Sequence, residues 1–556
     1  MKFVILARTK RLPDMIKYTL VMIAASILFS MPSKGQPVDL IVKNAKIYTV
    51  DPEFTIADAL AVKDGIFVGV GTEEEILNQF KSDNVIDAGG KTIYPGFIDA
   101  HCHFLMYGLT LQQANLRDTK SFDEILDILK KHRKENPEGW LEGTGWDHND
   151  WLVKKFPDNR KLNELFPNVP VILTRIDGHA VLANEAAIEA SGIHPNDFAP
   201  GEVIRENGKM TGIFLENAVD ALKNAIPPVS RKGKEEALLK AQRNCFAVGL
   251  TSVQDAGLPH TDIAIIDSLQ EKGNLKIRIY SMMSPDKENM EQLANGPVVK
   301  PRLHVASIKL YADGALGSRG AKLLEPYSDA PETSGIFVNE KEYLENICRK
   351  AYKAGFQINT HCIGDAAVKR MLDIYQEILG GPNDRRWRIE HVQIVAPEDF
   401  ARFGQFNIIP SVQTTHCTSD MYWAEERIGD RIKYAYAYRQ LLNENGWLAN
   451  GSDFPIEEIN PILGFYAGVV RKDPAGWPPN GFHPENAISR KEALRSMTIW
   501  AAKAAFEENE KGSIEQGKLA DFVMLDTDLM RAQEVQLSKA KVLLTVSNGE
   551  VVYQKE

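Results

Sequence analysis

The sequence predicts an α/β protein built on a (β/α)8 TIM barrel, with a small β-sandwich and a long insertion attached to it. Eight short apolar segments recur through the middle of the chain, and helical patterns separate most of them. Runs that alternate apolar and polar residues occur near the two ends of the chain. A long stretch after the first apolar segment interrupts the alternation of strands and helices.

Eight strands that alternate with helices favour a closed parallel barrel over an open sheet, and we place this barrel at residues 93–506. The predicted strands are Thr92–His103, Leu250–Asp255, Ile277–Met283, Ala306–Ala312, Phe356–His361, Trp387–Val392, Ile408–Gln413 and Trp447–Asp453. The clearest helical patterns are Glu235–Phe246, Glu342–Ala354, Ala366–Leu379 and Ile432–Asn445.

Both ends of the chain predict short antiparallel strands. Residues Val38–Val50 and Ala57–Val70 alternate in polarity, and a matching pattern returns over Phe522–Leu525, Val542–Ser547 and Val551–Tyr553. Each set has too few strands for a stable sheet. We therefore expect one composite β-sandwich formed by residues 36–92 and 507–556.

Residues 107–234 are too many for a single crossover between barrel strands. They hold Trp140, Trp146 and Trp151, a strand-like run at Val169–Arg175 and the sequence Asp177-Gly178-His179. Loops at the C-terminal face of a barrel carry specificity, so we interpret this stretch as an insertion after the first strand.

Residues 1–35 have the features of a secretory signal peptide. Several lysines and arginines precede the apolar run Tyr18–Phe29, and Ser33 and Gly35 offer small residues for cleavage. The run is shorter than the ~20 residues that span a bilayer. The sequence thus predicts a periplasmic or secreted protein with no stable membrane insertion after removal of the signal; an uncleaved membrane anchor is the alternative.

Composition narrows the class of protein further. The formal net charge of −10 argues against nucleic acid as a partner, because nucleic acid is bound by basic surfaces. Apolar residues make up 44% of the chain and charged ones 25%, the balance of a soluble globular protein. Five widely spaced cysteines imply no disulfide framework.

The first predicted strand ends in His101-Cys102-His103. Side chains two residues apart on a strand point to the same face, so the two imidazoles can bind one cation from one side. Two nearby histidines also occur by chance in solvated loops, so this motif alone leaves both readings open.

Other predicted strands end in, or carry, polar residues of the same kind. The active sites of TIM barrels lie at the C-terminal ends of the strands. A single histidine there is more often a hydrogen-bonded core residue, but six such residues on five strands fit a ligand cluster better. The sequence predicts one shared cavity for His101, His103, Lys309, His361, His391 and Asp453.

The sequence resembles the amidohydrolase superfamily, and within it the group of YtcJ-like hydrolases that includes N-substituted formamide deformylase. The matching segments run along nearly the whole chain after the signal and are specific for the family, though not for a substrate. They are residues 95–103, Asp177-Gly178-His179-Ala180, Lys309 with Asp313-Gly314, His361–Ala366, Arg388-Ile389-Glu390-His391, Pro410-Ser411-Val412-Gln413, Gly451–Pro455 and Gly512–Asp521.

The resemblance implies a barrel of the metal-dependent hydrolase type and a role for each matching residue. His101, His103 and Asp453 would hold a buried metal ion, and His361 and His391 a second, more exposed one. Lys309 would bridge the two ions as a carbamate formed with carbon dioxide. One ion or two, and modified or unmodified lysine, are alternatives that the residues leave open.

Nitrogen and oxygen ligands without a thiolate suit zinc, although iron, manganese or nickel would also fit. Such an ion lowers the pKa of bound water from 15.7 to about 7 and polarises a carbonyl. Asp453 is the expected proton acceptor, or else only a ligand. His416 and His179 are further catalytic candidates. Trp146, Trp151 and Trp423 would either line the substrate site or pack in the core.

The predicted function is metal-dependent hydrolysis of a small-molecule amide, namely an N-acyl amine, an N-formyl amine or a cyclic amide. An esterase, lactonase or carbamate hydrolase would use the same site. An exported binding protein without catalysis is the alternative from another class, and it predicts a missing ligand, whereas every ligand position is filled. A homodimer is a further expectation.

Overall fold

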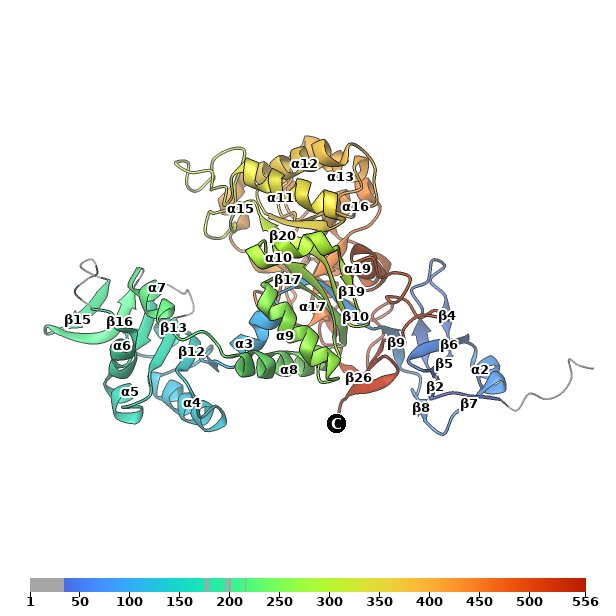
Figure 1. Ribbon diagram of the computed structural model, residues 1–556, viewed down its shortest axis with the longest axis horizontal. Coiled ribbons are helices and arrows are strands. Elements are labelled where there is room, and N and C mark those ends of the chain that lie inside the picture. The colour runs from blue at the N-terminus through green and yellow to red at the C-terminus, as the bar shows by residue number, and fades with distance from the viewer. Residues whose placement is uncertain (1–34, 176–179, 195, 197, 199–201, 216) are drawn as a thin grey trace, which may run out of the picture.

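A computed structural model describes residues 35–175, 180–194, 196, 198, 202–215 and 217–556. Residues 1–34 of the predicted signal peptide, and His179, lie outside these described residues. Figure 1 shows three parts of the molecule, with the barrel in the centre, the insertion on the left and the sandwich of the chain ends on the right.

The central part is a barrel of eight parallel strands that follow one another in chain order. The ring closes just beyond the strand ends, where Asp453 N–H donates to the carbonyl of His101 at 2.8 Å and His103 N–H to that of Phe454 at 2.8 Å. The predicted TIM barrel is confirmed. Its strands are β10 (Phe97–Cys102), β17 (Leu250–Leu258), β18 (Arg278–Met283), β20 (Leu303–Tyr311), β21 (Gln357–Cys362), β22 (Arg388–His391), β23 (Ile409–Gln413) and β24 (Ala449–Gly451).

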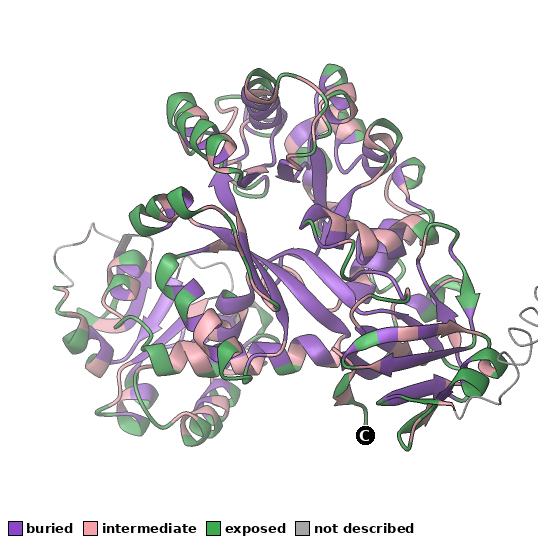
Figure 2. Cartoon of the chain, turned by 45° about the vertical axis from the view of Figure 1, so that its right-hand side comes forward, coloured by how far each residue is buried: buried purple, intermediate pink, exposed green. Residues whose placement is uncertain are grey.

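Helices surround the barrel, and Figure 2 shows buried strands inside a ring of helices with exposed outer faces. The helix Lys341–Ala354 buries Leu344, Ile347, Cys348 and Ala351, the spacing of one apolar helical face, and ends at Gly355 in the left-handed conformation. The main helices are α3 (Phe104–Thr110), α8 (Arg231–Ala247), α9 (His260–Glu271), α10 (Lys287–Gln292), α11 (Lys341–Ala354), α12 (Asp365–Leu379), α13 (Phe400–Gln405), α16 (Tyr438–Asn445), α17 (Pro461–Val470), α18 (Arg490–Ser496) and α19 (Ile499–Ala504).

Two predicted elements differ from the structure by more than a shift of their ends. The strand predicted at Thr92–His103 divides at Gly96 into β9 (Thr92–Pro95) and the barrel strand β10. A Cβ atom at Gly96 would lie 2.3 Å from Thr251 Oγ1, so the chain passes there only without a side chain. The helix predicted at Ile432–Asn445 begins only at Tyr438, because Tyr436 has a φ of +50°, which interrupts a right-handed helix.

The two chain ends form two facing sheets that enclose one apolar core. The first sheet has the order β6-β5-β2-β8 and the second β27-β26-β25-β9-β3-β4, so the C-terminal strands pair with strands before the barrel. The strands are β2 (Leu40–Lys43), β3 (Lys46–Tyr48), β4 (Ile56–Ala57), β5 (Ala59–Lys63), β6 (Ile66–Gly71), β8 (Val85–Asp87), β25 (Phe522–Leu525), β26 (Val542–Ser547) and β27 (Glu550–Gln554). Leu60, Phe67, Ile93 and Phe522 are fully buried in their shared core.

The insertion between α3 and α8 builds its own six-stranded sheet, in the order β11-β12-β13-β14-β16-β15. Trp146 and Trp151 are buried in its core and therefore pack the insertion instead of lining a substrate site. Its elements are β11 (Ala114–Asn115), α4 (Phe122–Glu135), β12 (Leu141–Trp146), α5 (Arg160–Leu165), β13 (Val171–Arg175), β14 (Ala180–Ala183), α6 (Glu185–Ser191), β15 (Val203–Glu206), β16 (Lys209–Leu215) and α7 (Asn217–Asn224).

Buried ion pairs join the C-terminal segment to the barrel. Arg278 on β18 contacts Asp521 at 2.9 Å, and Glu507 contacts His304 at 3.0 Å and Lys511 at 2.7 Å. No helix within the described ranges is long and apolar enough to cross a membrane.

Candidate metal centre

The structure brings all six predicted ligand positions to the C-terminal mouth of the barrel. His101 lies on β10, Lys309 on β20 and His361 on β21, and His391 ends β22. His103 and Asp453 lie just beyond their strands, since His103 is the N-cap of α3 and Asp453 follows β24 by two residues. The loops after parallel strands meet at one face, which explains how ligands so distant in sequence converge.

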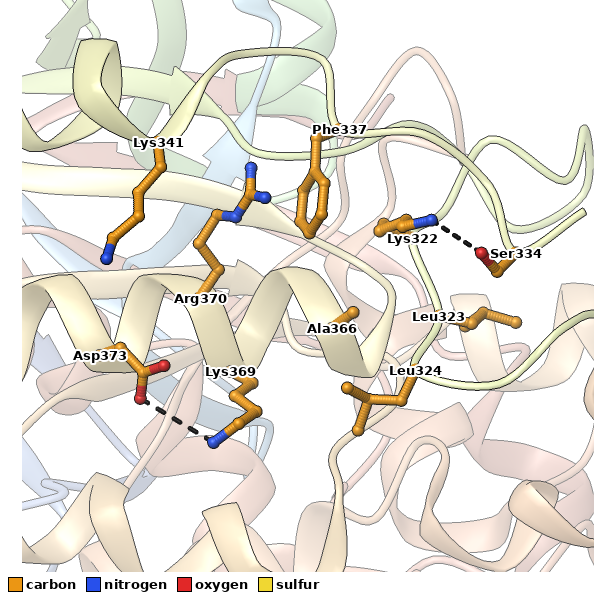
Figure 3. A pocket seen from close by; sticks show the side chains of 10 residues that line it. All are labelled: Lys322, Leu323, Leu324, Ser334, Phe337, Lys341, Ala366, Lys369, Arg370 and Asp373. Carbon is orange, nitrogen blue, oxygen red and sulfur yellow. Dashed lines mark hydrogen bonds and ion pairs between the residues drawn. The ribbon is translucent and has the colours of Figure 1, made fainter.

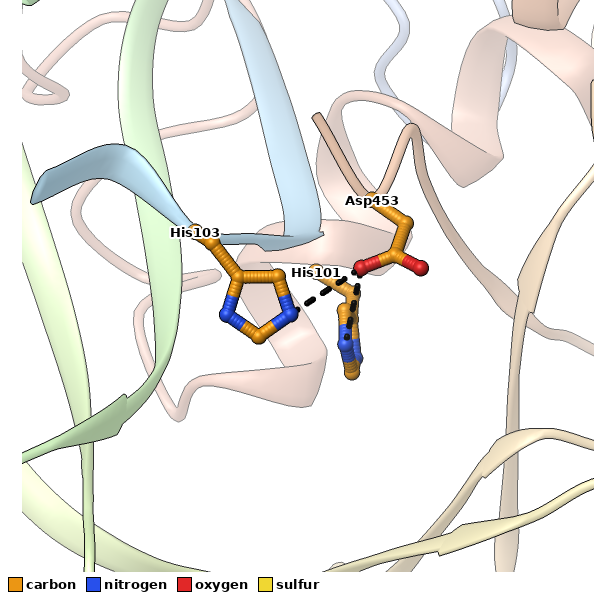
Figure 4. Close-up of side chains that lie close together, drawn as sticks. All are labelled: His101, His103 and Asp453. Carbon is orange, nitrogen blue, oxygen red and sulfur yellow. Dashed lines mark ion pairs between the residues drawn. The ribbon is translucent and has the colours of Figure 1, made fainter. Parts of the chain in front are cut away.

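His101, His103 and Asp453 form the first group (Figure 4). The Oδ1 atom of Asp453 lies 3.2 Å from His103 Nε2 and 3.6 Å from His101 Nε2. One donor atom of each residue lies within 4.8 Å of the other two, a spacing at which one ion could touch all three. The three residues are largely buried, and their nitrogen and oxygen donor atoms suit a divalent metal ion.

The second group lies beside the first and includes His416. The rings of His361 and His391 are 4.5 Å apart between centroids, and those of His101 and His391 are 4.9 Å apart. His391, His416 and Asp453 also bring donor atoms within 4.8 Å of one another. Lys309 Nζ lies 3.2 Å from His101 Nε2, so the lysine faces the same cavity.

Two ligand positions have backbone conformations that are unusual for their residue types. His391 has a φ of +74° and Asp453 a φ of +63°, in the left-handed region that favours glycine. Non-glycine residues in this region persist where the surrounding structure holds them, and they cluster at functional sites. Gly451 is equally constrained, because a Cβ atom there would lie 2.3 Å from the backbone nitrogen of His101.

Burial favours the uncharged form of three imidazoles, those of His101, His361 and His391, which can then offer a lone pair. Burial, together with nearby Lys309, lowers the pKa of His101 and lowers that of His361 to about 3. Burial also lowers the pKa of His391 far below its usual value and lowers that of the Lys309 ammonium. Burial alone would raise the pKa of Asp453, but hydrogen bonds with His103 and His416 lower it overall, so it stays a carboxylate.

Outer contacts orient these side chains. Glu390 Oε2 lies 2.6 Å from His101 Nδ1, which leaves His101 Nε2 facing the cavity. His103 Nδ1 contacts the Ala256 carbonyl at 3.0 Å in the same way. His416 Nδ1 lies 3.0 Å from Glu457, while its Nε2 lies 3.5 Å from Asp453 Oδ2.

Glu390 precedes the candidate ligand His391 in the sequence, which suggests an orienting role but not its target, and no signal in the sequence marks Glu457. Both contacts join residues far apart in sequence, and only the folded barrel reveals them. Two residues that follow Lys309 have structural roles: Asp313 accepts hydrogen bonds from the backbone N–H groups of Ile363 and Gly364, and Arg319 pairs with Asp329 at 2.7 Å.

A separate depression lies outside the barrel, against α12 (Figure 3). Its volume is about 410 Å³, and none of the six candidate ligands lines it. Two of the cations that line it have partners: Lys322 donates to Ser334 at 2.7 Å, and Lys369 lies 4.0 Å from Asp373. This depression is therefore distinct from the candidate metal centre.

Comparison with known proteins agrees with this geometry. The putative amidohydrolase YtcJ of Bacillus subtilis is 33% identical over 92% of this chain and 98% of its own. N-substituted formamide deformylase of Arthrobacter pascens is 28% identical over 93% of this chain and 98% of its own. The crystal structure of an uncharacterized metal-dependent hydrolase from Pyrococcus horikoshii has a TM-score of 0.76 and 27% identity, over 89% of this chain and 99% of that one.

The model of a family described as the amidohydrolase family matches residues 84–553, which is most of the chain. Amidohydrolases typically bind a divalent metal ion, in keeping with the cluster at the barrel mouth. The chain therefore belongs to the amidohydrolase family of hydrolases.

Proposed function

We propose that this protein hydrolyses the C–N bond of a non-peptide amide, namely an N-acyl amine, an N-formyl amine or a cyclic amide. The observation that carries the proposal is the position of Asp453, whose carboxylate lies between His103 at 3.2 Å and His416 at 3.5 Å. Similarity to a relative named N-substituted formamide deformylase supports the choice of amides.

The residues at the barrel mouth fit a divalent ion. His391 Nδ1 is buried without a hydrogen-bond partner in the described part of the chain, and the buried Asp453 Oδ1 faces His101 and His103, which are themselves candidate ligands. Such atoms are costly unless they bind something. His101, His103 and Asp453 would hold one ion, and His361 and His391 a second, with Lys309 between them as a carbamate; zinc is our first choice. When bound, the metal supplies Lewis acidity and lowers the pKa of water.

Asp453 and His416 perform the proton and charge chemistry. Asp453 is a buried carboxylate whose oxygens lie 3.2 Å from His103 and 3.5 Å from His416, and we assign it the role of accepting a proton from the attacking water and returning it to the leaving nitrogen. Burial would lower the pKa of His416, but hydrogen bonds with Asp453 and Glu457 raise it to about 10. The protonated His416 can donate a hydrogen bond to the negative charge that develops on the carbonyl oxygen.

The same groups would act on an ester, a lactone or a carbamate, which is the second candidate reaction, because metal-activated water attacks any activated carbonyl. A binding protein without catalysis would tolerate the loss of a ligand. All six ligand positions are instead occupied by residues able to coordinate, and their side chains lie close to one another at the barrel mouth.

The test is Asp453→Asn, which keeps the shape of the side chain but removes the proton acceptor. We expect the kcat/KM for matched amide and ester substrates to fall about 10²–10⁴-fold. Asp127→Asn, on the exposed face of α4, is the control and should retain full activity. Unchanged turnover in the Asp453 variant would remove the assigned proton acceptor, and faster turnover of esters than amides would favour the second candidate.

We also propose that the protein is exported and forms a homodimer. Cell fractionation would test export, and light scattering of the purified protein would test the dimer. Recovery in the cytoplasm, or the mass of a single chain, would contradict these two proposals.

A further inference from the structure

Three large apolar side chains stay exposed at the barrel mouth, each a few residues beyond a candidate metal ligand. Met106 is 42% exposed, Tyr311 is 38% exposed and Ile456 is 64% exposed. Single exposed apolar residues are normal on a protein surface. These three follow three different ligand-bearing strands, so the topology gathers them around one opening.

Tyr311 lies next to two of the candidate ligands, Lys309 and His361. It follows Lys309 by two residues on β20 and therefore points to the same face, and it pairs in register with His361 on β21. Its ring centroid lies 5.5 Å from that of His361 and 5.2 Å from Lys309 Nζ. Because Lys309 is buried, the phenol ring is the first accessible surface on this side of the cavity.

Met106 and Ile456 are held beside the other two ligands. His103 is the N-cap of α3 and Met106 the third residue of that helix, a spacing that places both on one side. Ile456 N–H donates to the carbonyl of Asp453 at 2.9 Å, so a tight turn keeps the isoleucine next to the carboxylate.

Two arginines beyond the barrel strands already have a carboxylate partner, and so does His416. Arg319 and Arg427 both pair with Asp329, and Glu457 pairs with His416. Neither arginine is therefore free to bind a carboxylate of the substrate, which would also lie close to Glu457. An uncharged, apolar group would gain contact area instead.

We infer that Met106, Tyr311 and Ile456 form an apolar substrate wall, and that the substrate is an uncharged amide with an apolar acyl group or N-substituent. This inference rests on the proposed amide hydrolysis and adds the class of substituent. Tyr311 is a specificity-determining residue in this assignment, because its ring is the part of the wall closest to the candidate ligands.

A series of N-alkylformamides, from methyl to hexyl, tests the wall by turnover. We expect kcat/KM to rise about fourfold for each added methylene until the wall is covered. The formamide of 6-aminohexanoate, which ends in a carboxylate, should react at least tenfold more slowly than N-hexylformamide. Tyr311→Ala should flatten the dependence on chain length, and Tyr311→Phe should keep it.

Two further variants guard against effects of misfolding. Ile456→Ser changes a mostly exposed side chain and should reduce the gain per methylene without loss of folded protein. Val299→Ala alters an exposed valine on β19 (Val298–Val299), which pairs with the opposite end of β20 from Tyr311, and should leave the dependence on chain length unchanged. Equal kcat/KM for all chain lengths in the unmodified protein would refute the inference that these residues form an apolar substrate wall.

Binding of hydroxamates separates this inference from the proposed reaction. Acetohydroxamate, butyrohydroxamate and hexanohydroxamate chelate metal ions and differ only in their apolar tails. The metal-loaded protein should bind the hexanoyl compound at least tenfold more tightly than the acetyl one, and Tyr311→Ala should remove that difference. If affinity rises with the length of the hydroxamate tail but no amide is hydrolysed, the proposed reaction is refuted and the apolar wall stands. If amides are hydrolysed but all three hydroxamates bind equally tightly, the apolar wall is refuted and the reaction stands.

Discussion

The contact between Glu390 and His101 gives a prediction that can be worked out from the structure. Glu390 Oε2 lies 2.6 Å from His101 Nδ1, and both side chains are completely buried. Glu390→Gln keeps the size of the side chain but removes its charge. The Nδ1–H group of His101 would then donate to a neutral amide oxygen, and His101 would lose part of its basicity toward a metal ion.

Hydrogen bonds to charged groups contribute about 1.5–3 kcal/mol, against about 0.5–1.5 kcal/mol for neutral ones. A loss of about 1.4 kcal/mol corresponds to a tenfold change in affinity. Since no solvent reaches this pair, we expect the affinity for zinc to fall about 10–100-fold, the range typical of such orienting groups.

The assay is a competition titration of zinc against a chelator of known affinity, with circular dichroism to verify the fold. The matched control is Glu345→Gln on α11, where a half-buried glutamate far from the site pairs with Arg349 at 2.7 Å. This control should bind zinc as the unmodified protein does. A folded Glu390→Gln protein whose zinc affinity changes less than twofold would refute the reasoning.

Two further predictions concern the stability of the fold. Gly451→Ala places a Cβ atom 2.3 Å from His101 N, and we expect urea unfolding to show at least ~2 kcal/mol lower stability; an unchanged midpoint would contradict the tight approach. Asp521→Asn leaves buried Arg278 without its carboxylate, and we expect a loss of about 3–5 kcal/mol at pH 7. Burial raises the pKa of Asp521 but Arg278 lowers it overall, so its stabilisation is present above the unfolded pKa and is lost as the pH falls below about 4. A difference between Asp521→Asn and the unmodified protein that stays constant down to pH 3 would refute this assignment.

The barrel could be predicted from the sequence because its strands are continuous apolar runs between helices with one apolar face. The division at Gly96 could not be predicted, because the residues on both sides of it are equally apolar. The close approach of Thr251 to Gly96 is visible only in the folded barrel. The start of α16 at Tyr438 could not be predicted either, because nothing in the sequence pattern shows that Tyr436 takes a positive φ.

The candidate ligands could be predicted because histidines and an aspartate at strand ends are a local signal. Their partners are not local: Glu390 faces His101 from the opposite side of the barrel, and Glu457 meets His416 only across two loops. Tyr311 was missed for another reason, since an aromatic residue at the end of a strand gives no sign of whether it packs or stays exposed. The tryptophans of the insertion drew attention as a substrate wall, yet they fill its core.

The metal content of the purified protein tests the central claim most directly. Elemental analysis should find one or two divalent ions for each chain, and a double variant His101→Asn, His103→Asn should lose at least one of them while staying folded. Removal of the metal by a chelator should abolish hydrolysis, and added zinc should restore it. A folded protein that contains no divalent metal, and whose activity is indifferent to chelator and to added zinc, would contradict the account.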